Sequence, residues 1–259
     1  MITLRAGRTL LASASLVGVA ALGLSAMPAP GPVPLSGTSS ASATAEGILS
    51  QVALRPASLG TASYAFSSVV DSKPVRWNPC APIRWTSNTS RGPAGGLDVL
   101  KASVARIAAV TGTSWQYVGP TTKVPSVGYL PRSAVTAYPP VLIGWTDGTA
   151  SDLLRAQPRS VLGMTRTAWF GVVKPDGRKV VATRAAVIAL DRTDALPLRG
   201  ATSWSAVVLH ELGHSMGLAH PSDSRQLMAS VLPRTIADLQ TGDRDGLSRL
   251  GRTAGCITL

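Results

Sequence analysis

The histidines of this sequence, which are the side chains best suited to binding a metal near neutral pH, all lie in one short segment. The 259 residues include three histidines and two glutamates, and all three histidines and one glutamate fall between His210 and His220. Side chains four residues apart share one face of a helix, so the imidazoles of His210 and His214 can bind one ion. Gly217 can end that helix in a left-handed conformation. The chain can then bring His220 back as a third ligand.

The chemistry expected of this segment is hydrolysis of an amide. Three neutral imidazoles suit zinc and leave its fourth position open for water. Glu211 is rotated by about 100° from His210 on the helix, beside the ion and not on it. We therefore expect a zinc-activated water, with Glu211 as the general base that later protonates the leaving amine. A structural zinc normally takes a fourth protein ligand and has no use for Glu211.

The elements that must position this segment predict an α+β fold. Apolar residues recur with the period of a helix over 97–111, and further helices are expected over 203–216 and 235–250. Five segments with strand patterns are 83–87, 114–118, 139–145, 161–170 and 180–190. One early helix and two late ones indicate a mixed sheet packed against helices.

The first 27 residues have the features of an export signal. Arg5 and Arg8 precede an apolar run from Leu10 to Leu24. A membrane-spanning helix needs about 20 apolar residues, so the run is short for one, although an uncleaved anchor is the alternative. Residues 28–74 are expected to form a Pro/Ser/Ala-rich linker or a short propeptide, and 75–259 the folded catalytic domain. We expect a secreted protein, either free, membrane-anchored or associated with the cell wall.

The sequence contains two cysteines, Cys80 and Cys256. In an exported chain two cysteines most simply form one disulfide, which would join the beginning of the folded domain to its last residues. The alternative is a thiolate held on the metal as a latency switch, which would leave Cys256 unpaired.

The net positive charge is best explained as a solvated basic surface, not as a binding site for one specific partner. The formal net charge is +12, from 25 Lys and Arg against 13 Asp and Glu. The basic residues are scattered singly, and no nucleic-acid motif is present. We therefore expect a monomer with no nucleic-acid partner, whose surface can associate with anionic cell-wall polymer. The composition, rich in Arg and Ala and poor in Lys, is typical of a high-GC bacterium.

The histidine segment resembles a known signature. The pattern His210-Glu211-x-x-His214-x-x-Gly217-x-x-His220 is similar to the zinc signature of the metzincin metallopeptidases. The metzincins also place a methionine beneath the zinc in a tight turn, and Met228 fits that role. The short interval between His220 and Met228 is most similar to the matrixin branch.

The resemblance implies a domain divided by a substrate cleft. The larger upper part would hold a twisted five-stranded mixed sheet, and a small C-terminal lower part would follow Gly217, with three helices in all. An extended polypeptide substrate would pair with the antiparallel edge strand, here 161–170. Residues 229–233 would form a wall of the main specificity pocket.

Several departures from the matrixin pattern shape these expectations. The latency cysteine segment is missing, as are the extra histidines and acids of the structural zinc and calcium sites, so we expect one zinc ion. The residue after His220 is Pro221 and not an acid, which argues against the bacterial branch whose third ligand is an aspartate, and Asp223 is expected to be a turn residue. Two other functions stay open: a non-catalytic, zinc-containing module that binds the cell surface or wall, and a zinc hydrolase of a non-peptide amide.

Overall fold

The computed structural model describes residues 48–50, 60–155, 157–158 and 160–258. The predicted signal peptide or anchor over 1–27 lies outside these residues. Within the described part of the chain, no helix is both long and apolar enough to cross a membrane.

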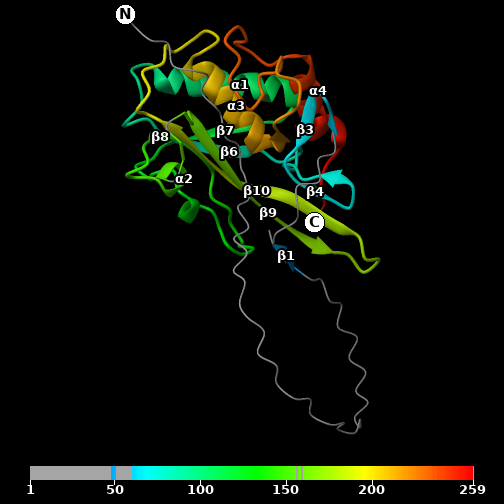
Figure 1. The fold of residues 1–259 in the computed structure, drawn as a ribbon. Coiled ribbons are helices and arrows are strands. Elements are labelled where there is room, and N and C mark those ends of the chain that lie inside the picture. Colours follow the sequence, from blue (N-terminus) through cyan, green and yellow to red (C-terminus); the bar gives the residue numbers. More distant parts are fainter. Residues whose placement is uncertain (1–47, 51–59, 156, 159, 259) are drawn as a thin grey trace, which may run out of the picture.

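A mixed sheet of six strands forms the centre of an α+β fold, in the order β1-β9-β10-β8-β6-β7 (Figure 1). Its strands are β1 (Ile48–Ser50), β6 (Ile83–Asn88), β7 (Trp115–Pro120), β8 (Val141–Thr146), β9 (Gly163–Val173) and β10 (Lys179–Asp191). β7, β6, β8 and β10 are parallel, and β9 is antiparallel to β10. The five strands from β6 to β10 are those expected from the sequence, and β1 is a sixth.

Two helices cover one face of this sheet, and a shorter one lies on the other (Figure 1). α1 (Gly96–Thr111) and α3 (Trp204–Met216) lie together on the first face, with α4 (Thr241–Leu250) beside them. The second face carries α2 (Asp152–Arg155), and the 3-10 turns are η1 (Val127–Tyr129) and η2 (Arg252–Ala254). The central strand β8 is buried on both faces, because Leu142 faces α2 while Val141 and Ile143 face the long helices.

The last helix is shorter than its sequence pattern predicts. α4 begins at Thr241 and not near residue 235. The backbone N–H of Gln240 donates to Oδ2 of Asp243 over 2.8 Å. This capping contact fixes the first turn of the helix at Gln240, so the preceding residues form a loop.

Residues ahead of the predicted domain boundary at 75 also contact the folded body. β3 (Tyr64–Phe66) pairs with β2 (Gly60–Thr61) on one side and with β11 (Leu218–Ala219) on the other, and Phe66 lies in the main core. β4 (Val69–Val70) and β5 (Lys73–Pro74) form a hairpin. Whether 28–74 acts as a linker or a propeptide stays a prediction.

The predicted disulfide between Cys80 and Cys256 is present. Asn78, close to Cys80 in the sequence, donates from Nδ2 to the carbonyl of Ile257 and accepts its N–H, each over 3.1 Å. No cysteine thiol is free to bind a metal in the described residues.

Candidate metal centre

A serine cap begins helix α3, and a glycine with a positive φ ends it. Ser203 has an extended backbone, and its hydroxyl accepts the N–H of Ala206, which caps the helix. At the other end Gly217 has φ +120°, and a Cβ there would lie 2.8 Å from the carbonyl oxygen of Val75. A residue with a side chain is disfavoured on both counts. The chain therefore turns at Gly217 into β11, which pairs with β3 and leads directly to His220.

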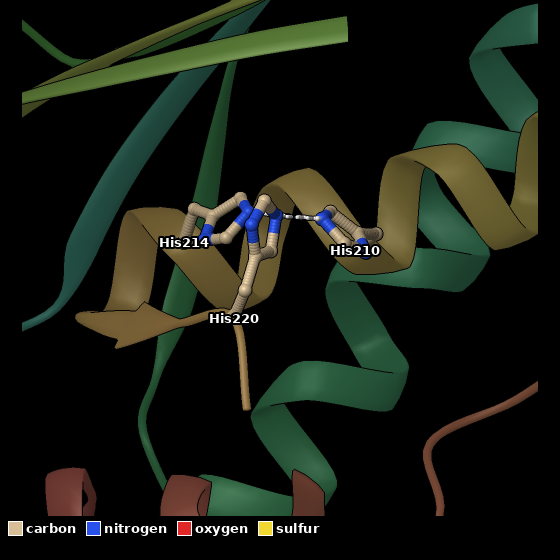
Figure 2. A group of neighbouring side chains, drawn as sticks. All are labelled: His210, His214 and His220. Carbon is tan, nitrogen blue, oxygen red and sulfur yellow. Dashed lines mark hydrogen bonds between the residues drawn. The ribbon is translucent and has the colours of Figure 1, made fainter. Parts of the chain in front are cut away.

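The three histidines converge on one point (Figure 2). His210 and His214 project from α3, and His220 approaches from the chain that follows β11. Nε2 of His210 lies 2.9 Å from Nε2 of His214 and 3.3 Å from Nε2 of His220. His210 and His214 are buried, and His220 is partly exposed. The three imidazoles therefore form a triad that solvent reaches on the side of His220.

The hydrogen bonds of the imidazoles fit a metal ion. Nδ1 of His210 lies 2.7 Å from the carbonyl oxygen of Leu227, and Nδ1 of His214 lies 2.8 Å from that of Leu218. A carbonyl only accepts, so each Nδ1 carries the proton and each Nε2 presents a lone pair. Lone pairs this close repel unless a cation lies between them. Zinc–nitrogen bonds of about 2.0–2.1 Å give a tetrahedral edge of about 3.3 Å, so the donor set fits zinc.

Burial keeps these imidazoles neutral. Desolvation lowers the pKa of His210 to about 3 and that of His220 to about 4. The same cause lowers the pKa of His214 well below its usual value, with the neighbouring imidazoles adding to the effect. Neutral imidazole is the form that binds a metal, so protons compete weakly for these ligands near neutral pH.

Glu211, which follows His210 on α3, is fully buried. One carboxylate oxygen, Oε2, accepts the hydroxyl of Thr165 over 2.7 Å. The other, Oε1, is buried without a hydrogen-bond partner among the described residues. Burial raises the pKa of Glu211 to about 8, although the Thr165 hydroxyl acts in the opposite direction. A carboxyl group whose pKa lies near neutral pH can both accept and release a proton at that pH.

Met228 packs against the helix that carries the histidines. A Cβ on Gly213 would clash with Sδ of Met228, so the thioether lies directly on the helix backbone. The turn that holds Met228 is fixed by Asp243, whose carboxylate accepts the N–H of Leu227 over 2.8 Å and that of Met228 over 3.2 Å. The role of Met228 beneath a zinc ion stays a prediction.

The remaining candidates lie close by. Asp223 accepts the backbone N–H and the guanidinium of Arg225, as expected of a turn residue. In the segment 229–233, Ala229 and Leu232 are buried and Ser230 and Val231 are exposed. Thr165 and Asp243 could not be identified from local sequence patterns, because both reach the site through contacts between distant segments.

Comparison with known protein families gives a match over part of the chain. Residues 132–251 match the family model described as Matrixin. The matched range runs from the loop before β8 through α4 and includes the three histidines, Glu211, Gly217 and Met228. No curated protein matches the sequence. The matched family is one of zinc metallopeptidases.

Proposed function

We propose that this matrixin-like chain is a secreted zinc-dependent endopeptidase of the metzincin type. The observation that carries the proposal is the fully buried carboxyl of Glu211, which follows His210 on the helix that supplies two of the three imidazoles. Burying a carboxyl group without full hydrogen bonding costs free energy. A fold that used zinc only as a structural support would gain nothing from that cost.

Each residue of the site has a defined part in this reaction. His210, His214 and His220 hold the zinc, and their neutral state leaves the charge of the ion uncompensated. When bound, zinc lowers the pKa of a water molecule and polarises the substrate carbonyl. Glu211 accepts the proton of the attacking water and delivers it to the leaving amine. No covalent intermediate with the protein is required.

The substrate in this proposal is an extended polypeptide that pairs with β9. This strand contacts helix α3 at Thr165 and Glu211, so a chain lying along it passes the metal site. Among the described residues, β1 pairs with β9 only from Phe170 to Val172. In the part of the chain that the structure describes, residues 163–169 pair with β10 alone, and in this proposal a peptide adds its backbone hydrogen bonds on their other side. Residues 229–233 form one wall of the specificity pocket.

The test combines metal analysis with peptide hydrolysis. Zinc-loaded wild type, E211Q and D245N are incubated with casein and with a peptide library, with and without a zinc chelator. Asp245 is exposed on α4 and makes a matched charge control. We expect wild type and D245N to cleave peptides in a chelator-sensitive way, and E211Q to bind zinc without cleaving.

Other outcomes separate the competing functions. Full activity of E211Q would contradict the proposed role of Glu211. Zinc binding with no hydrolysis of casein, peptides or purified cell wall would favour the binding module. Cleavage of cell-wall material alone, detected by mass spectrometry, would favour a hydrolase of non-peptide amides.

Secretion is part of the same proposal. The export-type sequence of residues 1–27 supports it, as does the presence of a disulfide, which persists in oxidising compartments. N-terminal sequencing of protein recovered from the culture medium tests it, and retention of the intact chain in the membrane fraction would favour the anchor.

A further inference from the structure

Two residues of strand β9 contact the carboxylate of Glu211, although neither belongs to the histidine segment. Oγ1 of Thr165 lies 2.7 Å from Oε2 of Glu211. A Cβ on Gly163 would lie 2.9 Å from Cγ and 3.0 Å from Oε1 of the same side chain. Residues two apart on a strand project to the same face. Strand β9 therefore meets Glu211 at both positions.

The hydrogen bond between Thr165 and Glu211 is shielded from water. Both side chains are fully buried. The carboxylate form of Glu211 only accepts, so the threonine hydroxyl donates to it. The same hydroxyl oxygen lies 3.1 Å from the carbonyl oxygen of Glu211, so it sits between the backbone and the side chain of one residue. A bond to an ionised group in a low-dielectric interior is strong, and it restricts rotation of the carboxylate.

The two oxygens of Glu211 consequently have different surroundings. Oε2 receives the Thr165 hydroxyl, whereas Oε1 accepts no hydrogen bond from the described residues. Oε1 occupies the space next to Gly163, which a larger residue would fill. An orphaned buried oxygen in a native site calls for a functional explanation.

We propose that Thr165 is a positioning residue that holds Oε2 of Glu211, so that Oε1 is the oxygen that takes the proton from the attacking water. Gly163 leaves the room that Oε1 needs. This inference rests on the proposed function, in which Glu211 is the general base. It assigns to strand β9 a second role besides pairing with substrate, namely fixing the geometry of the base.

The first experiment measures kcat, KM and zinc content of T165V, T165S and T86V. T165V keeps the shape of the side chain but removes the donor, and T165S restores the donor. Thr86 is a matched control on β6, because its buried hydroxyl donates to the carbonyl of Gly119 over 2.7 Å, away from the site. We expect kcat of T165V to fall by about tenfold to a hundredfold with KM and zinc content unchanged. T165S and T86V should keep kcat near the wild-type value.

The second experiment observes the carboxylate directly. Crystal structures of zinc-loaded wild type and T165V should show Glu211 rotated in the variant, with the three histidines in place. G163A should also lower kcat, because its methyl group would displace Oε1.

The outcomes distinguish this inference from the proposed function. An active E211Q would overturn the proposed function. An inactive E211Q together with wild-type kcat in T165V would overturn the present inference alone. Loss of zinc from T165V in proportion to lost activity would also overturn it, because Thr165 would then serve the metal ligands and not the base.

Discussion

The buried carboxylate of Asp243 on α4 accepts the backbone N–H of Leu227, in the segment between β11 and α4, over 2.8 Å. The carbonyl of the same Leu227 accepts Nδ1–H of His210 over 2.7 Å. Asp243 therefore acts on the metal centre through one peptide unit. Partners of this kind fix the orientation and the tautomer of a ligating imidazole.

Removing the Asp243 carboxylate should weaken metal binding. In D243A the N–H groups of Leu227 and Met228 lose their buried acceptor. We expect the zinc affinity to fall about tenfold to a hundredfold. Competition with a chelator of known affinity measures it. D245A removes an exposed carboxylate from the same helix and should leave the zinc affinity unchanged; equal affinities for D243A and wild type would contradict the prediction.

The contact between Gly213 and Met228 should be intolerant of added volume. G213A places a methyl group onto the thioether sulfur in a filled core. We expect the free energy of unfolding to fall by about 1–3 kcal/mol, as for other overpacked sites. Denaturant unfolding of the metal-free protein measures this. G128A is the matched control, because a Cβ there meets only one atom, 3.9 Å away.

Zinc should stabilise the folded protein through the histidine triad. An ion that binds the folded state alone adds about 2.7 kcal/mol when its free concentration is 100 times Kd. We expect zinc to raise the melting temperature of the wild type and of E211Q, but not that of H210A. A similar rise in H210A would mean that the ion binds elsewhere.

Much of the fold can be predicted from local patterns. The long helices α1 and α3 and the five strands β6 to β10 follow from periodicity, because each buries one continuous face or, like β8, both. The histidine spacing indicates the ligands for the same reason, since His210 and His214 are neighbours on one helix.

Features that depend on distant segments could not be predicted in this way. Thr165 and Glu211 are 46 positions apart, and the strand pattern around Thr165 does not distinguish it from any buried threonine. The predicted start of α4 near residue 235 was wrong, because Asp243 caps the helix at Gln240 and also accepts the N–H of Leu227 in the preceding turn. β3 pairs with β11, a strand far away in the sequence whose position depends on where α3 ends, so local patterns do not predict this pairing.

The ion pairs of Asp147 should give the protein an acid-sensitive component of stability. The Thr149 hydroxyl and the Arg192 guanidinium hold the pKa of Asp147 well below its usual range, and Arg91 forms a second ion pair. An unfolded Asp has a pKa of about 3.9. The folded state therefore binds fewer protons than the unfolded state below that pH, and the stabilisation present above pH 4 is lost as the pH falls towards the folded pKa.

The variant D147N tests this relationship. Because both arginines are partly exposed, we expect D147N to be less stable than the wild type by about 1 kcal/mol at pH 7. The difference should shrink below pH 4, measured by denaturant unfolding across the pH range. D176N, which removes an exposed ion pair with Arg178, should change the free energy of unfolding less than D147N does, because solvent screens that pair. A difference between D147N and wild type that stays constant with pH would contradict the assignment.

The bond between Cys80 and Cys256 joins residues 176 positions apart, and every residue of the metal site lies between them. At high concentration one copy of a peptidase can cleave another copy. Exposed surface loops are the usual sites of such cleavage. A single cut anywhere between these two cysteines yields two fragments that stay covalently joined. Damaged molecules would therefore migrate as intact protein on a non-reducing gel and separate only after reduction, and a nicked enzyme would keep both halves of its site together.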